Sequence, residues 1–214
     1  PRPRGAAARQ AAGSGWQGVA DRRPVAAMWL TGLLLMLANM SIEPIITVYV
    51  AQLVHEAAHV TMVAGVVMSA GALGSILSAA RLGRLADRIG HWNVTVACLG
   101  AAALLLVPQA FVSAGWQLVL LRFLMGLALG GLLPCIAAVI RHSVPDGTAG
   151  RMLGWSVSAQ YAGQVAGPLI GGWIGGHAGM RWVFLGTSVL MAAGALGNAA
   201  VQRAVRGAQA KAAK

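Results

Sequence analysis

The sequence predicts an all-α, polytopic membrane protein with six transmembrane helices. Three features of the composition predict this fold class: 57% of the 214 residues are hydrophobic, 10% are charged, and the mean hydropathy is +0.70. Soluble domains are about one quarter charged, so this chain lacks the side chains needed to cover a water-facing surface. The composition therefore argues against a cytosolic enzyme, a nucleic-acid-binding module and a disordered chain.

Six apolar segments make up the predicted fold. A helix must run roughly 20 residues to cross about 30 Å of hydrocarbon, and backbone polar groups in lipid need partners within the segment. We therefore predict helices at residues 25–50, 61–80, 94–114, 116–140, 152–174 and 182–202. The expected organisation is a basic flexible arm or interdomain linker at 1–24, the bundle at 25–203 and a cytoplasmic tail at 204–214.

The basic residues predict the orientation of these helices. Of the 16 lysines and arginines, fourteen lie in the N-terminal arm, the second-to-third and fourth-to-fifth connections, and the tail. The opposite side has only Arg181, and Arg122 lies within a span. Because cytoplasmic connections are enriched in lysine and arginine, we expect both termini in the cytoplasm. Pro44 and Pro134 lie 19 and 18 residues into the first and fourth spans, which favours a 3+3 inverted repeat.

Polar and methionine side chains share the first predicted span. Asn39, Glu43 and Thr47 recur at steps of four, which places them on one helix face, and Met36 and Met40 lie close by. A polar face rich in thioethers suits a cavity that accepts varied amphiphiles. Core packing explains the methionines equally well, so both interpretations stay open.

The second connection carries a short charged segment. Residues 83–90 read Gly-Arg-Leu-Ala-Asp-Arg-Ile-Gly. Glycines permit a tight turn between two spans, and an acid flanked by arginines can bind a neighbouring helix end. The residues that carry this pattern are Gly83, Asp87, Arg88 and Gly90.

The fifth predicted span combines glycines with two amides. Gln160 and Gln164 share one helix face with Gly167 and Gly171, and small residues let helices approach closely. The amides can hydrogen-bond a ligand or a neighbouring helix, and both alternatives are open. We expect the glycine face to be buried against a partner bundle. Aromatic candidates for contact with a drug are Trp155 and Tyr161.

Three segments resemble, in order, motifs of the drug/proton antiporters of the major facilitator superfamily. They are the charged connection, the fourth-span segment Arg122-Phe-Leu-Met-Gly126, and a glycine-proline pattern in the fifth span. Every spacing of the third motif is met, by Gly154, Gly163, Gly167, Pro168, Gly171 and Gly172. The resemblance covers residues 25–203 and implies that these spans are helices seven to twelve of a twelve-helix transporter in a bacterial inner membrane.

The resemblance also implies an activity and partners. The activity is proton-coupled efflux of drug-like amphiphiles by alternating access, with no cofactor and no catalysed reaction, and the charged connection would act as a gate latch. The expected partners are drug-like molecules, protons, the bilayer, and either an N-terminal six-helix half or a second copy of the chain, but no nucleic acid. We favour a fragment of a longer protein, because the chain opens on Pro1 and an arm that resembles a linker.

Two ionisable residues lie at matching depth within the spans. Glu43 lies seven residues before Val50, and Arg122 lies six residues after Trp116. At 1.5 Å per residue, each is about 10 Å below the outer surface. An unpaired charge in the membrane costs about 3 kcal/mol on insertion scales, so we hypothesise a pair that opens when Glu43 takes up a proton. The alternatives are a static salt bridge and a Glu43 that faces a water-filled vestibule.

Two other functions need consideration. Residues 55–59 read His55-Glu56-Ala-Ala-His59, a zinc-protease pattern, and Asp146 resembles the third ligand of intramembrane metalloproteases. The two parts are expected on opposite sides of a membrane about 30 Å thick, whereas zinc–ligand bonds are about 2 Å long, so we expect no metal site. A non-transporting scaffold would keep the glycine pattern without needing Glu43.

Overall fold

The computed structural model describes residues 21–53 and 57–212, in which every regular element is an α-helix. Long apolar segments without turn residues favour helices, because each helix satisfies its backbone polar groups internally. The helices are α2 (Arg23–Leu53), α3 (Ala57–Ile89), α4 (His91–Gln109), α5 (Gly115–Leu129), α6 (Leu132–Ser143), α7 (Asp146–His177) and α8 (Met180–Ala212).

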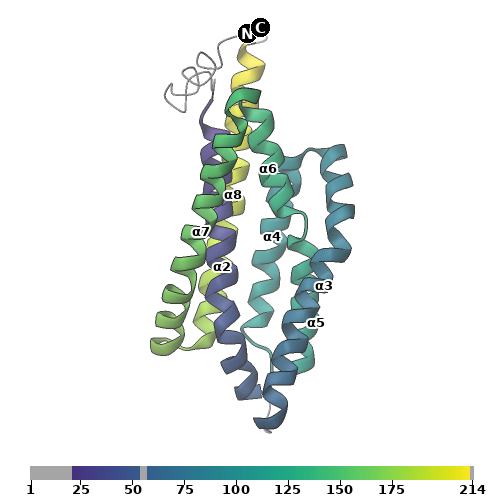
Figure 1. The fold of residues 1–214 in the computed structure, drawn as a ribbon, viewed down its shortest axis with the longest axis vertical. Helices are drawn as coiled ribbons and strands as arrows, with labels where there is room; N and C mark the ends of the chain where they lie inside the picture. Colours follow the sequence, from purple (N-terminus) through teal and green to yellow (C-terminus); the bar gives the residue numbers. More distant parts are fainter. Residues whose placement is uncertain (1–20, 54–56, 213–214) are drawn as a thin grey trace, which may run out of the picture.

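The helices run up and down along one axis (Figure 1). Since α5 and α6 follow each other in a single rod, the described helices form six rods. The interruption between them is Gly130–Gly131, inside the predicted span 116–140. The start of α2 and the end of α8 lie at the same end of the bundle (Figure 1). The predicted all-α, six-helix fold is thereby confirmed.

Five of the six rods in the described residues are long and apolar enough to cross a membrane. They are Arg23–Gln52, His59–Ile89, His91–Gln109, Gly115–Ser143 and Met180–Ala208. The remaining rod is α7, which has 32 residues but a lower hydropathy because glycine, serine and glutamine interrupt its apolar residues. The predicted span 152–174 is therefore a helix of sufficient length with a less apolar composition than its neighbours.

Two predicted boundaries differ from the structure. The charged segment 83–90 is not a loop, because α3 continues through Ile89 and only Gly90 forms the turn, with a φ of 94°. Glycine adopts that angle without the steric cost that a Cβ would add. The expected tail at 204–214 is helical as far as Ala212, as a direct continuation of α8.

The pattern of helix contacts follows an inverted repeat. The three most extensive interfaces join α2 with α7, α3 with α5, and α4 with α8. These are the first rod with the fifth, the second with the fourth, and the third with the sixth. A repeat of three plus three helices related by a two-fold axis converts the first interface into the second and the third into itself.

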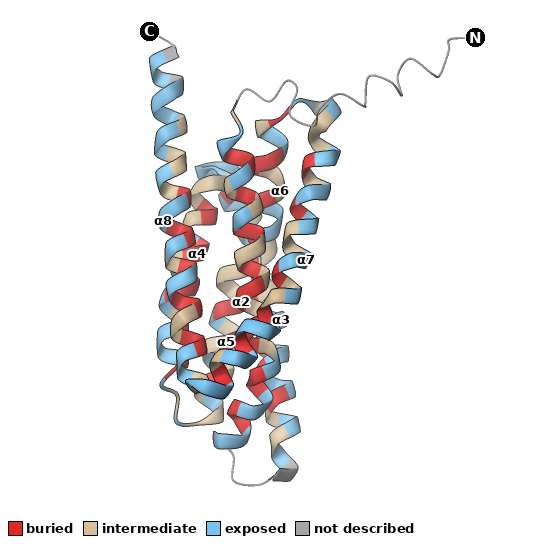
Figure 2. Ribbon diagram, turned by 90° about the vertical axis from the view of Figure 1, so that its left-hand side faces the viewer, coloured by how far each residue is buried: buried red, intermediate tan, exposed pale blue. Residues whose placement is uncertain are grey.

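Buried residues lie on the inward faces of the helices, whereas the outer faces are exposed (Figure 2). Phe184, Leu99 and Leu106 are fully buried in the core. The outer faces carry large apolar side chains, and Leu104 on α4 is 75% exposed. Apolar residues exposed in such number are typical of a surface that contacts lipid or another membrane-embedded unit.

Three glycines of α7 pack directly against the backbone of α2. A Cβ added at Gly163 would collide with the carbonyl oxygen of Leu33, and one at Gly171 with that of Ser41. At Gly167 it would come within 2.7 Å of the Cβ of Met40. The expectation that this face is buried against a partner bundle is therefore wrong, because α2 of the same bundle already covers it.

The remaining members of the glycine-proline motif lie outside that crossing. A Cβ at Gly154 or Gly172 would meet nothing within 4 Å, and Pro168 is exposed. Along a helix, residues three and four apart share a face, whereas immediate neighbours do not. The motif therefore divides into a packed face, which touches α2, and an open face.

Candidate functional site

A cavity of about 370 Å³ lies between α2, α3 and α5, and both Glu43 and Arg122 line it. Cavities of roughly 300–1,000 Å³ hold small-molecule ligands in many proteins. Glu43 comes from the middle of α2, and Arg122 comes from α5, one turn before Gly126. The structure therefore brings the two ionisable residues from separate spans to the same cavity.

Arg122 is a buried cation that makes no hydrogen bond to any described residue. Its side chain is 9% exposed, and Nε and Nη2 are buried without a hydrogen-bond partner among the described residues. Glu43 is the charge that acts on the guanidinium electrostatically. No ion pair within 4.0 Å joins them in the described part of the chain. The hypothesised direct pair is thus absent in this conformation, although both groups face one cavity.

The helix that carries Glu43 is locally altered beside it. Pro44 follows Glu43 inside α2, and proline has no N–H to donate to the carbonyl four residues earlier. That carbonyl belongs to Met40, which also lines the cavity. The wall of the cavity near Glu43 therefore has weaker helical hydrogen bonding than the rest of α2.

The predicted cavity residues of α2 divide between two surfaces. Met36, Asn39 and Met40 line the cavity. Thr47, one turn beyond Glu43, is exposed and lies outside the lining. Of the three polar residues predicted at steps of four, Asn39 and Glu43 therefore line the cavity, whereas Thr47 lies at the bundle surface.

The two amides of α7 contact α2 rather than the cavity. Gln164 Nε2 donates to the sulfur of Met36 at 3.6 Å, so it contacts a cavity residue from outside the lining. Gln160 packs over Gly32, and its Nε2 donates to Ser156 Oγ at 3.4 Å. The structure therefore places both amides at the interface between α2 and α7.

The two aromatic candidates also lie outside this cavity. The ring of Trp155 lies 6.3 Å from that of Trp29, centroid to centroid. Tyr161 is 62% exposed on α7. Both belong to the outward side of α7, away from the wall formed by α3 and α5.

Most residues that line the cavity escaped the sequence prediction. Among them are Met68 and Ser75 of α3 and Met125 of α5. Met68 and Ser75 are seven residues apart, so they share a helix face, and Met125 lies one turn after Arg122. With Met36 and Met40, the cavity has four methionines, whose flexible thioethers adapt to ligands of different shape.

The charged segment at the end of α3 is exposed. Asp87 is 72% exposed, and its Oδ1 lies 3.5 Å from Nε2 of His91, an ion pair only when the imidazole is protonated. Arg84 donates from Nε to the carbonyl of Ala80 at 3.4 Å. The segment therefore presents its charges at one end of the bundle, where a neighbouring element could bind them.

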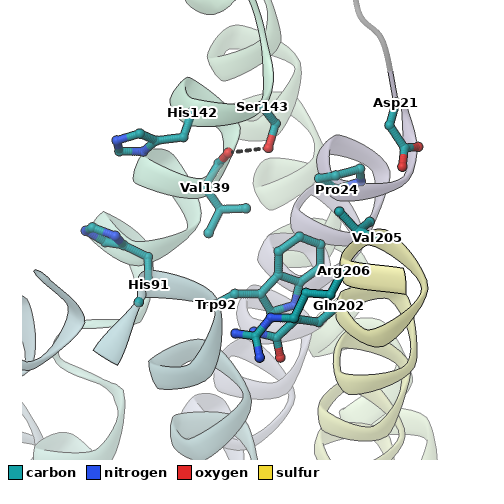
Figure 3. A pocket seen from close by; sticks show the side chains of 11 residues that line it. Asp21, Pro24, His91, Trp92, Val139, His142, Ser143, Gln202, Val205 and Arg206 are labelled. Carbon is teal, nitrogen blue, oxygen red and sulfur yellow. Dashed lines mark hydrogen bonds between the residues drawn. The ribbon is translucent and has the colours of Figure 1, made fainter. Parts of the chain in front are cut away.

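A larger cavity, of about 480 Å³, lies where α2 and α4 begin and α6 and α8 end (Figure 3). Its polar side chains have protein partners. Trp92 Nε1 donates to the carbonyl of Asn198 at 3.1 Å, and Arg206 Nη2 to Asn93 Oδ1 at 3.4 Å. His142 Nδ1 lies 2.7 Å from the carbonyl of Ala138. The cavity lined by Glu43 and Arg122, called the central cavity below, differs because no described residue accepts a hydrogen bond from its arginine. We take the central cavity as the candidate site.

The described parts of the zinc-protease pattern lie far apart along the bundle. His55 and Glu56 lie outside the described residues. His59 lies near the start of α3, whereas α7 begins at Asp146 at the opposite end of the bundle (Figure 1). Within the described residues, no group of three histidine, cysteine or acidic side chains could hold a metal ion.

Comparisons with known proteins identify relatives over most of the chain. A family model described as Major Facilitator Superfamily matches residues 28–213. A multidrug resistance protein MdtG from Enterobacter lignolyticus is 38% identical over 167 residues, which are 78% of this chain and 40% of that protein. An uncharacterized MFS-type transporter YuxJ from Bacillus subtilis is 40% identical over 172 residues, 79% of this chain and 44% of that protein. The chain thus spans about two fifths of the length of these curated relatives.

Proposed function

This chain belongs to the major facilitator superfamily of membrane transporters, and from that premise we propose that it exports small amphiphilic molecules in exchange for protons. A relative 38% identical to it is a multidrug resistance protein, which supports drug-like substrates. Because the chain matches about two fifths of such relatives, the proposed working unit contains a second six-helix bundle. That bundle is either the other half of a longer chain or a second copy.

The observation that carries this proposal is the joint position of Glu43 and Arg122 on one cavity. Ionisable residues within membrane helices are costly and mark ion or substrate pathways. A proton on Glu43 removes the negative charge that acts on Arg122, so protonation changes the electrostatics of the whole cavity. Glu43 is the proposed proton-binding group, and Arg122 is the group that senses its charge.

The remaining cavity residues suit the proposed substrates. Met36, Met40, Met68 and Met125 provide an apolar and polarizable lining, and Asn39 adds an amide. Such a lining binds apolar bodies of varied shape without demanding one geometry. Specificity would then depend on the charged groups of the substrate.

The proposed transport cycle is alternating access, in which this bundle rocks against its counterpart around a central site. The proposed location is the bacterial inner membrane with both chain ends in the cytoplasm, supported by the lysine and arginine bias of the connections. Asp87 and Arg88, near the end of α3, would latch the cytoplasmic gate by binding the second bundle.

The test is drug-dependent proton flux in vesicles that contain the complete transporter, followed with a pH-sensitive dye in the lumen. Wild-type protein is expected to move protons when a drug gradient is applied. Glu43→Gln should abolish this flux, because the amide cannot take up the proton. Asp21→Asn is the matched control, since Asp21 lies outside the central cavity. Unchanged flux in Glu43→Gln would exclude the proposed coupling.

A further inference from the structure

The unsatisfied groups of Arg122 indicate the chemistry of a missing partner. Nε and Nη2 are both buried without an acceptor. They lie on the same edge of the guanidinium plane, so their N–H groups point in parallel. Arginine uses such an edge to bind the two oxygens of one carboxylate or phosphate. Buried donors that lack an acceptor are costly, and an oxyanion at this edge removes the cost.

Glu43 indicates a partner of the opposite sign. Its carboxylate faces the same cavity, and in the described residues no hydrogen bond or ion pair within 4.0 Å engages it. Carboxylates inside a membrane protein are stabilised by cations. The cavity therefore presents an acid and a base that do not satisfy each other.

The charges of the cavity limit which ligands can bind it well. Among the described residues, Glu43 and Arg122 are the only charged ones in the lining; α3 and α6 contribute uncharged side chains, and the polar members are Asn39 and Ser75. A ligand with a single charge would leave a net charge in a site of low dielectric constant. A ligand with both charges pairs each group and keeps the site neutral.

We propose that the central cavity binds zwitterionic amphiphiles, with an oxyanion on the Nε–Nη2 edge of Arg122 and a cationic amine at Glu43. The apolar body of the ligand lies against the methionines. The inference rests on the proposed function in treating these ligands as transported substrates, whereas their binding requires no transport. A proton on Glu43 competes with the ligand's cation, so affinity for the zwitterion falls as the pH is lowered.

The experiment uses three probes with the same decyl chain: N-decylglycine, decylammonium and undecanoate. Their binding to the full chain in lipid nanodiscs is measured by titration calorimetry, with empty nanodiscs as the background. The zwitterion is expected to bind roughly tenfold or more tightly than either singly charged probe, the difference that one charge-assisted hydrogen bond makes. Equal or tighter binding of either singly charged probe would overturn the proposal.

Three variants test which residue binds each charge of the ligand. Arg122→Gln should remove the preference for the zwitterion over the ammonium probe, and Arg122→Lys should restore part of it. Glu43→Gln should remove the preference over undecanoate and the pH dependence. Because each readout is a ratio within one variant, partial loss of folded protein does not affect it. Arg181→Gln, outside the cavity, is the control. A ratio unchanged in Arg122→Gln would contradict the assignment.

The binding result is independent of the proposed transport. If vesicles show no drug-dependent proton flux but the zwitterion preference depends on Arg122, the ligand class stands and the export function fails. If flux depends on Glu43 but the three probes bind equally, the export function stands and the ligand class fails.

Discussion

Two helix pairs in this bundle cross at glycines, and the glycines are distributed differently in each. Where α7 crosses α2, the glycines that pack against the backbone of the other helix come from α7 alone, at Gly163, Gly167 and Gly171, whereas Gly32 of α2 meets only a side chain. Where α5 crosses α3, both helices contribute. A Cβ at Gly74 would collide with the carbonyl of Phe123, and one at Gly126 with the carbonyl of Gly71.

This difference explains where the cavity forms. At the α3–α5 crossing, glycines on both helices remove side chains from both sides of the contact, and Gly71, Gly126 and Gly130 line the cavity beside it. At the α2–α7 crossing, α2 fills the contact with its own backbone and side chains. The α2–α7 crossing holds α7 on the bundle, whereas the α3–α5 crossing also builds the site that contains Arg122.

The largest expected effect comes from closing each crossing with a branched side chain. Gly126→Val and Gly163→Val should each destabilise the bundle by about 3 kcal/mol or more, because the three added carbon atoms force the backbones apart. Only Gly126→Val should also weaken ligand binding, since Gly126 lines the cavity. Thermal unfolding and calorimetric titration of the folded fraction measure the two effects. Equal loss of binding in both variants would show that the α2–α7 crossing supports the cavity as much as the α3–α5 crossing does.

A smaller effect on stability is expected when alanine replaces either of two adjacent glycines of α7, and its sign should differ between them. Gly171→Ala should cost about 1–3 kcal/mol, because its Cβ meets the carbonyl of Ser41. Gly172→Ala meets nothing within 4 Å and should stabilise the helix by about 0.5–1 kcal/mol, the difference between glycine and alanine in helices. Unfolding midpoints measured in the same detergent test both. A stabilising Gly171→Ala would show that the helices are not in contact there.

The smallest effect compares one hydroxyl from each crossing. Ser41 Oγ shares its one proton between the carbonyls of Leu37 at 2.7 Å and Gly167 at 3.1 Å, and Ser75 Oγ donates to that of Gly126 at 3.3 Å. Ser41→Ala and Ser75→Ala should each lower the unfolding free energy by about 0.6 kcal/mol, the mean for interhelical hydrogen bonds in membranes. A double variant should show additive losses, because the two crossings are separate. Strong coupling between them would mean that the crossings act as one unit.

The sequence allowed part of this comparison to be predicted. The glycine pattern of α7 was evident, because three glycines recur at the four-residue steps of one helix face. The α3–α5 crossing was missed, although Gly126 and Gly130 carry the same signal in a shorter form. Two glycines in a span are common, and their significance depends on the helix opposite, which a single sequence does not reveal.

The sequence also could not predict which helix each face of α7 contacts. The glycine face of α7 was assigned to a second bundle, whereas it packs on α2. Gln160 and Gln164, predicted equally as cavity or packing residues, contact α2 as well. Helical periodicity states which residues share a face, but the rotation of that face within the bundle depends on all the neighbouring helices.

By itself the sequence determined the number and order of the helices, and it placed an acid and a base at similar depth in two of them. These properties follow from local hydrophobicity and from counting residues along a helix of fixed rise. Only the tertiary structure decided that Glu43 and Arg122 share a cavity without forming an ion pair, and that α3 provides its third wall. The physical reason is that the close approach of helices at glycines, which local sequence permits but does not assign, decides which side chains meet.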